Sequence, residues 1–167
     1  MKNIILIGMP GCGKSTVGVI LAKTLGTYFI DTDLIIQVQR RNTLQQLIDL
    51  EGLDRFLEYE EEALLSVTEK ENTVVATGGS AIFSQKAMTQ LKRSGVCVYL
   101  ELELDELERR LSNIKTRGIA SKKGETLKDI FEIRGPLYER YADIKIYAKG
   151  KTPEEIVEEI VKNISDC

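Results

Sequence analysis

A short glycine-rich segment near the start of the chain constrains the fold more than any other feature. Residues 8–16 read Gly-Met-Pro-Gly-Cys-Gly-Lys-Ser-Thr, which fits the pattern G-x-x-x-x-G-K-[ST]. The preceding run, Asn3 to Ile7, is apolar and β-branched and predicts a buried strand. The following residues, 15–25, carry apolar side chains at helical spacing and predict a helix that stops at Gly26. A strand, a phosphate-binding loop and a helix in this order predict a P-loop fold.

The chemistry of this loop is that of a nucleotide cradle. Glycines let successive backbone N–H groups turn toward one anion, and the helix that follows adds the partial positive charge of its N-terminus. We expect Lys14 to act catalytically by bridging the β- and γ-phosphates of ATP, and the Ser15 hydroxyl to ligate Mg²⁺. The other cradle residues expected to bind the nucleotide are Gly11, Cys12, Gly13 and Thr16. The alternative is a glycine-rich turn that binds nothing.

Short apolar strands alternate with helical segments along the rest of the chain. Further strands are expected at 28–30, 73–76, 96–100 and 144–147, and further helices at 34–40, 44–50, 56–70, 85–93, 104–111, 127–141 and 152–164. This alternation predicts an α/β fold in which helices cover both faces of a parallel sheet. Gly135-Pro136 is expected to bend or interrupt its helix. Residues 113–125, rich in Lys, Gly and Ser, predict a mobile loop, and the absence of a linker predicts one domain over 1–167.

Composition excludes several kinds of chemistry and partner. The 167 residues include no histidine, which excludes a Ser-His-Asp triad and leaves a carboxylate as general base. The cysteines (Cys12, Cys97 and Cys167) are odd in number and far apart, which favours a reducing compartment. The net charge of −3, with scattered Lys and Arg, argues against nucleic-acid binding. No apolar run approaches the ~20 residues of a membrane span, and no signal peptide is recognisable. We expect a cytoplasmic monomer with a small-molecule partner.

A pair of carboxylates follows the second expected strand. Asp31 and Asp33 are two residues apart, and strand geometry would place both side chains on the same side. At the carboxyl edge of a parallel sheet that side faces the ligand crevice. One carboxylate would hold Mg²⁺, while the other would orient an acceptor hydroxyl and take its proton. The alternative is a turn in which Asp33 caps the next helix.

Glycines and arginines complete the candidate site. Gly78 and Gly79 follow the third strand, where glycine permits a substrate to approach the backbone closely, or merely forms a tight turn. Arg117, in the loop 113–125, would neutralise charge on the transferred phosphoryl group, or is an exposed loop residue. Arg134 would bind an anionic group of the acceptor, or forms a surface ion pair.

An acidic run and a cysteine in the cradle both have simple structural explanations. The acidic run Glu58, Glu60, Glu61 and Glu62 predicts a solvated helix face. Cys12 within the cradle is interpreted as a small side chain, with a reactive thiol as the alternative.

Taken together, these residues resemble the shikimate kinases, in the nucleoside monophosphate kinase branch of the P-loop proteins. The resemblance runs nearly end to end, and the elements that carry it are the cradle, Phe29-Ile30-Asp31-Thr32-Asp33, Thr77-Gly78-Gly79, the loop around Arg117, and Arg134 with Pro136-Leu137-Tyr138. It implies a five-stranded parallel sheet in the order 2-3-1-4-5 with a mobile lid at about 113–125. It also implies ATP:shikimate 3-phosphotransferase activity, which belongs to aromatic amino acid biosynthesis.

The resemblance also implies roles for individual residues. By this likeness Asp33 contacts the reacting hydroxyl, and Asp31 sits near Mg²⁺. Gly79 and Arg134 contact shikimate. Arg117 contacts ATP.

The acceptor half of the chain departs from the family pattern at two positions. The family normally has an arginine that grips the shikimate carboxylate where this chain has Leu57, and Arg55 lies about 200° away around a helix. The family's third glycine after the third strand is replaced by Ser80. Kinase activity on another small hydroxylated metabolite therefore stays open as an alternative. A nucleotide-binding switch without transfer chemistry is a third interpretation, against which the presence of Asp33 and Arg117 argues.

Overall fold

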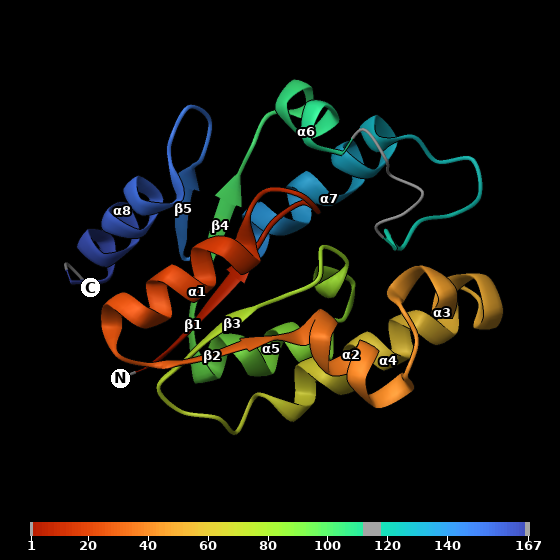
Figure 1. Cartoon of the computed structure of the whole chain (residues 1–167), viewed down its shortest axis with the longest axis horizontal. Coiled ribbons are helices and arrows are strands. Elements are labelled where there is room, and N and C mark those ends of the chain that lie inside the picture. Colours follow the sequence, from red (N-terminus) through yellow and green to blue (C-terminus); the bar gives the residue numbers. More distant parts are fainter. Residues whose placement is uncertain (1, 112–117, 166–167) are drawn as a thin grey trace.

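A five-stranded parallel sheet forms the centre of the molecule (Figure 1). The computed structural model describes residues 2–111 and 118–165. The strand order is β2-β3-β1-β4-β5, and every neighbouring pair is parallel. The strands are β1 (Asn3–Ile7), β2 (Tyr28–Asp31), β3 (Thr73–Ala76), β4 (Gly95–Glu101) and β5 (Ile144–Tyr147). The expected strand order is confirmed.

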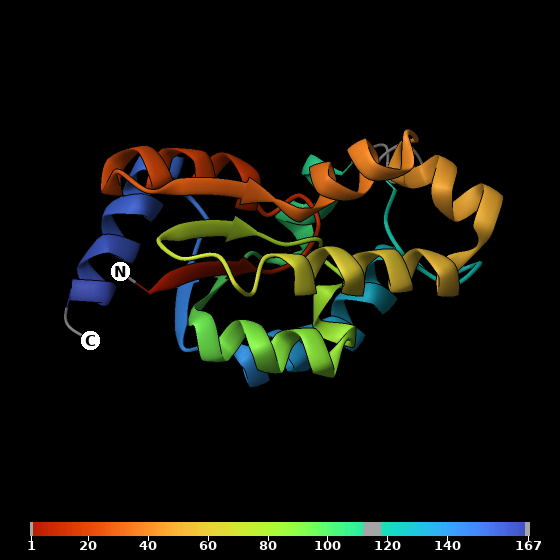
Figure 2. The ribbon, with the colours of Figure 1, turned by 90° about the horizontal axis from the view of Figure 1, so that it is seen from below.

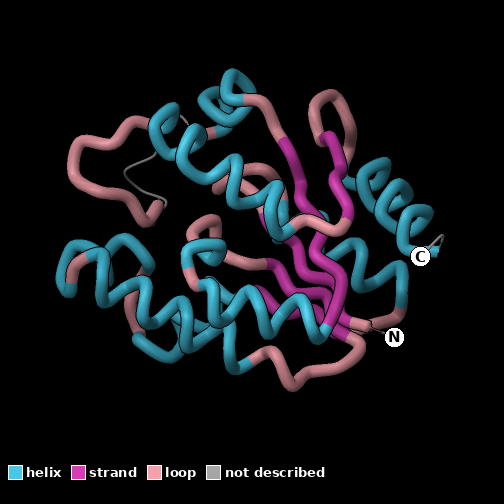
Figure 3. Tube along the Cα trace, turned by 180° about the vertical axis from the view of Figure 1, so that it is seen from behind, coloured by secondary structure: helices cyan, strands magenta, loops and turns pink. Residues whose placement is uncertain are grey.

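Helices cover both faces of this sheet. They are α1 (Lys14–Leu25), α2 (Thr32–Arg40), α3 (Leu44–Glu51), α4 (Leu53–Ser66), the 3₁₀ turn η1 (Ala81–Phe83), α5 (Gln85–Ser94), α6 (Leu104–Arg110), α7 (Leu127–Tyr141) and α8 (Pro153–Ser165). Seen along its edge, the sheet has α1 and α8 on one face and α5 and α7 on the other (Figure 2). Seen from behind, the strands are enclosed between these layers (Figure 3). Helices α2 and α3 extend beyond the carboxyl ends of the strands (Figure 2).

The central strand is buried because it pairs on both sides and is covered on both faces. The four apolar residues of β1, Ile4 to Ile7, are each at most 1% exposed. The same is true of Val74 to Ala76 in β3. Parallel strands covered by helices on both faces are expected to be continuously apolar rather than alternating. This burial explains why short apolar runs located the strands in the sequence.

A smaller apolar cluster lies apart from the core around the sheet. It is formed by Ile36, Leu47, Phe56, Tyr59, Ala63 and Ala120. The cluster joins α2, α3 and α4 to the segment after residue 118, so it fixes these elements around the carboxyl edge of the sheet. Because Glu60 lies one turn after Phe56 on the same side of α4, it is turned inward as well.

Helix α7 differs from the prediction that Gly135-Pro136 would interrupt it. It runs from Leu127 to Tyr141 without interruption, and Pro136 lies inside it. Proline removes only its own N–H donor from the helix. A capping box between Thr126 and Asp129 secures the start of α7, and its buried residues lie on both sides of the proline. The predicted interruption at Gly135-Pro136 is therefore wrong.

No described helix combines the length and the apolar character that crossing a bilayer would require.

Asn3 is a buried polar side chain that ties the start of β1 to the segment entering β3. Its Nδ2 donates to the Lys70 carbonyl at 2.5 Å, and its Oδ1 accepts from the Thr73 N–H at 3.0 Å. We predict that Asn3→Ala lowers the free energy of unfolding by about 1–3 kcal/mol, because the buried Thr73 N–H and the partly buried Lys70 carbonyl lose their partner. Urea denaturation measures the change. The matched control is Asn163→Ala on the surface of α8, for which we expect less than about 0.5 kcal/mol. Equal effects of the two substitutions would contradict this account.

Candidate active site

The cradle closes around the ammonium group of Lys14. Its three glycines, Gly8, Gly11 and Gly13, have φ angles of 146°, 79° and 101°, a region that L-residues with a side chain rarely adopt. Lys14 Nζ donates to the carbonyls of Gly8 and Met9 at 2.7 and 2.9 Å. Because neutral carbonyls hold the ammonium, its charge stays available to an anion in the loop.

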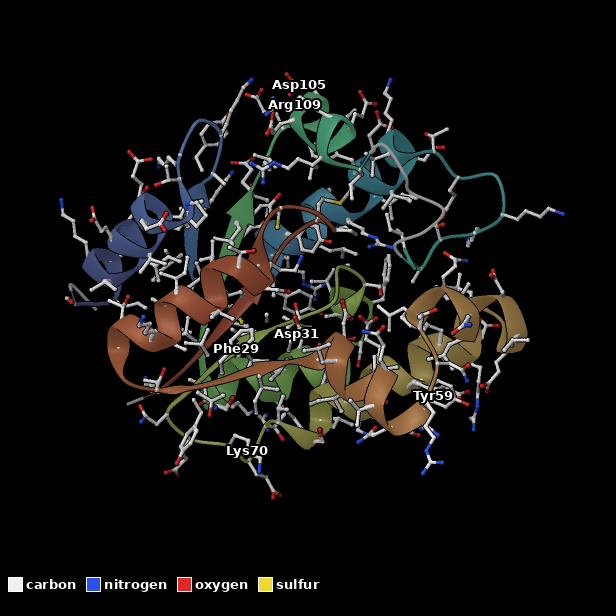
Figure 4. All side chains as sticks on the ribbon, in the orientation of Figure 1. Phe29, Asp31, Tyr59, Lys70, Asp105 and Arg109 are labelled. Atoms are coloured by element: carbon white, nitrogen blue, oxygen red, sulfur yellow. The ribbon has the colours of Figure 1, made fainter. Side chains whose placement is uncertain are left out.

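Asp31 connects the cradle helix to α2. Its Oδ2 accepts from Ser15 Oγ at 2.6 Å, and its Oδ1 accepts from the backbone N–H of Asp33 at 3.0 Å as the N-cap of α2. Figure 4 labels Asp31 where β2 passes into α2. The strand therefore ends at Asp31 and Asp33 belongs to the first turn of the helix, so the strand-geometry argument for the pair is wrong. The cap of α2 is Asp31 rather than Asp33.

A cavity of about 510 Å³ joins the cradle to the carboxyl edge of the sheet. Of the residues expected at the site, it is lined by Gly11, Gly13, Lys14, Ser15, Thr16, Asp33, Gly78, Gly79 and Arg134. Asp31 lies at its margin through Ser15. Cys12 is 1% exposed, which fits a small buried side chain better than an accessible thiol. Arg117 lies outside the described residues.

Two carboxylates meet inside this cavity. A Cβ atom at Gly78 would collide with both Glu60 Oε1 and Asp33 Oδ1, so the absence of a side chain at this position leaves room for them. Burial, and then the charge of Asp31, raise the pKa of Asp33 to about 6. Burial, and then the charge of Asp33, raise the pKa of Glu60 to about 7. The cavity therefore holds acidic groups that titrate close to neutral pH.

Arg134 lies inside the protein. It is 2% exposed, its Nη2 donates to the carbonyl of Ala120, and its guanidinium lies 5.4 Å from the centre of the Phe83 ring. One turn further along α7, Tyr138 donates its hydroxyl proton to the Gly79 carbonyl at 2.5 Å. A surface ion pair, the alternative interpretation of Arg134, does not fit this burial.

Sequence reasoning missed several residues of the cavity. Glu60 is 2% exposed rather than part of a solvated acidic face, and its spacing from Phe56 and Ala63 on the buried side of α4 could have revealed it. In the sequence, Ser80 stands out only as a departure from a glycine pattern. Arg110, which lines the cavity next to the cradle, gave no sequence signal.

Comparison with known proteins decides the family. A family model described as shikimate kinase matches residues 10–165. The chain belongs to the shikimate kinase family. A shikimate kinase from Thermodesulfovibrio yellowstonii is 37% identical over 164 residues, which cover 97% of this chain and 94% of the relative. A shikimate kinase from a Sulfurihydrogenibium species is also 37% identical, over 98% of both chains.

Solved structures of shikimate kinases agree with this assignment. The structure from Acinetobacter baumannii, in complex with shikimate, superposes with a TM-score of 0.92 at 31% identity, over 99% of this chain and 94% of that one. The structure from Aquifex aeolicus gives 0.86 at 32% identity, over 98% of this chain and 96% of that one. A gluconokinase from Sinorhizobium meliloti, at 17% identity and a TM-score of 0.60, shares the fold alone.

The raised pKa of Asp33 predicts that the free energy of unfolding of this shikimate kinase family member depends on pH. The pKa of Asp33 in the folded protein, about 6, lies above its ordinary value of 3.8, so the folded state loses stability as pH rises from about 4 through 6. We predict that Asp33→Asn raises the free energy of unfolding at pH 8 by about 1–2 kcal/mol, and that the gain disappears toward pH 4. Urea denaturation across this range, without nucleotide, measures it. The control is Asp49→Asn at an exposed position. A gain independent of pH would argue against burial of the charge as its cause.

Proposed function

We propose that this protein transfers the γ-phosphoryl group of ATP to a hydroxyl of shikimate, giving shikimate 3-phosphate and ADP. The observation that carries the proposal is the single cavity that joins the Lys14 cradle to Asp33, Gly79 and Arg134 in a member of this family. The relative solved with shikimate supports the choice of acceptor.

The cradle forms the nucleotide half of the proposed site. Backbone N–H groups of the loop and Lys14 Nζ bind the phosphates, where the N-terminus of α1 adds its partial charge. The Ser15 hydroxyl and the Asp31 carboxylate are hard oxygen ligands at the cradle, which fit Mg²⁺. Bound Mg²⁺ usually keeps several waters and takes one or two protein oxygens, and it supplies neutralisation of phosphate charge. We include Arg117 as an ATP-binding catalytic residue by resemblance.

The acceptor half supplies the base and the anion-binding group. As the acceptor oxygen bonds to phosphorus and the bond to the β–γ bridging oxygen breaks, the Asp33 carboxylate takes the hydroxyl proton. A pKa of about 6 makes Asp33 a stronger base than an ordinary aspartate while leaving it largely ionised at pH 7.5. Gly78 and Gly79 let the acceptor approach the backbone. Arg134 binds the acceptor's carboxylate.

The setting of this activity is proposed on the same basis. We take residues 1–167 as one kinase domain with a lid at about 113–125. The protein is proposed to be a cytoplasmic monomer of aromatic amino acid biosynthesis that binds neither nucleic acid nor membranes.

A coupled ADP-release assay tests the function directly. ADP should appear with ATP, Mg²⁺ and shikimate and not with ATP and Mg²⁺ alone. A panel of small polyols and hydroxy acids serves as the comparison. Lys14→Ala, which removes the ammonium charge that would act on the transferred phosphoryl group, is the background control for contaminating kinases. Turnover of a panel compound but not of shikimate would refute the proposed acceptor while retaining the kinase chemistry.

We predict that Asp33→Asn lowers kcat for shikimate by ~10²-fold or more and leaves the Kd for ATP within a few-fold, because the amide cannot accept the proton. In the parent, kcat/KM should fall as the pH drops below about 6, where Asp33 becomes protonated. Steady-state kinetics from pH 5 to 8 and nucleotide titration measure both effects. Loss of ATP binding with unchanged kcat would instead assign Asp33 to the metal or the helix terminus.

A further prediction concerns Leu57, which stands where the family pattern has an arginine. A charge-assisted hydrogen bond contributes roughly 1.5–3 kcal/mol, so the parent should bind shikimate about ten- to a hundred-fold more weakly than an arginine-containing site would. Leu57→Arg should lower the KM for shikimate. If the cavity is instead rebuilt for another hydroxylated metabolite, Leu57→Arg should impair turnover of that compound. A low-micromolar KM in the parent would show that another group holds the carboxylate.

A further inference from the structure

Glu60 is a buried carboxylate with a defined partner on one oxygen only. Its Oε2 accepts from Ser80 Oγ at 2.5 Å, while its Oε1 has no hydrogen-bond partner among the described residues. Three groups favour its ionised form, in the order Ser80, Arg134 and Lys14. Among the described residues the Ser80 hydroxyl is the one hydrogen-bond partner of the Glu60 carboxylate, while Arg134 and Lys14 act on it through their charge.

Position 57 lies on the same face of α4 as Glu60. Residues three apart are neighbours on a helix surface, so a cation at position 57 would reach the Glu60 carboxylate. Leu57 offers no donor. Leu57, Glu60 and Ser80 line a second cavity of about 400 Å³, and Glu60 and Ser80 also line the 510 Å³ cavity that contains Asp33. Two elements, α4 at position 57 and the turn after β3 at position 80, thus approach the same carboxylate.

The place of Glu60 also bears on Asp33. Oxygens of both side chains approach the Cα of Gly78 closely enough to exclude a Cβ there. The charge of Asp33 in turn raises the pKa of Glu60. A Glu60 side chain that lost its anchor would therefore be free to move within the cavity that contains Asp33.

We propose that Ser80 is a positioning residue, which holds Glu60 in the acceptor cavity in place of a cation at position 57. Leu57 and Ser80 then form one coupled departure from the family pattern rather than two separate ones. The proposal rests on the proposed function in that it takes the 510 Å³ cavity, which Glu60 and Ser80 also line, as the acceptor's.

The first test follows the Glu60 carboxyl itself, in the protein without ligands. Carbon-13 NMR of labelled glutamate, assigned by the signal that Glu60→Gln removes, gives the pH at which it titrates. In Ser80→Ala this pH should rise by about one unit, because the lost hydrogen bond stabilised the charge. Adding Leu57→Arg should lower it again, and by more than Leu57→Arg does in the parent. Ser84→Ala is the matched control, since Ser84 Oγ makes the same 2.5 Å bond to the neighbouring Glu61 and should leave the Glu60 titration unchanged.

The second test uses shikimate kinetics as a double-mutant cycle. Ser80→Ala should raise the KM for shikimate about ten-fold with a smaller change in kcat, and Leu57→Arg should lower KM by a larger factor in that background than in the parent. An unshifted Glu60 titration in Ser80→Ala, or independent effects of the two substitutions, would overturn the proposal. Ser80→Gly provides a second variant if Ser80→Ala does not fold. A shifted titration in a protein that does not turn over shikimate would refute the proposed acceptor and leave the role of Ser80 standing.

Discussion

The parallel pairing of β1 with β3 on one side and β4 on the other is the constraint on which the site depends. Parallel strands end at the same edge, so the cradle after β1, the Asp31 cap after β2 and the glycine turn after β3 emerge side by side. The cradle and the glycine turn are far apart in the sequence, and the pairing of β1 with β3 is enough to bring them together. The backbone N–H of Thr77, bonded to the Leu6 carbonyl at 3.2 Å, extends this pairing to the rim of the cavity.

The cavity concentrates charge at the carboxyl edge of an apolar core. Lys14 and Arg134 contribute positive charge, while Asp33 and Glu60 contribute negative charge with raised pKa values. Desolvated carboxylates destabilise the folded protein. The burial of the apolar residues of β1 and β3 stabilises the fold and offsets this cost. These strands lie in the core, so the stabilisation does not depend on the groups in the cavity. A stable core beside a destabilised edge is common at functional sites.

Local patterns predicted the fold and the cradle because both depend on neighbours in the chain. The apolar run of β1 and the Lys14 motif each carry their own signal, and the sheet order came from the family resemblance. Glu60 was misread because an acidic run suggested solvent, although burial is decided by the direction of each side chain around α4. The interruption at Pro136 was wrong because packing holds α7 together beyond its local propensity. The pairing of Ser80 with Glu60 could not be read from the sequence, because it joins elements that only the fold brings together.

The bond from Arg134 to the carbonyl of Ala120 has a thermodynamic consequence. A guanidinium has five N–H donors, so one part of Arg134 can hold the backbone after residue 118 while another part binds an anion. Both contacts use the Arg134 side chain. The contact with Ala120 already restricts that side chain, so binding an anion costs less conformational entropy. Linkage then requires reciprocity: if the acceptor's carboxylate stabilises the segment at Ala120, that segment must increase the affinity for the acceptor by the same factor. The position of the segment at Ala120 and the affinity for the acceptor would thus be thermodynamically coupled through Arg134.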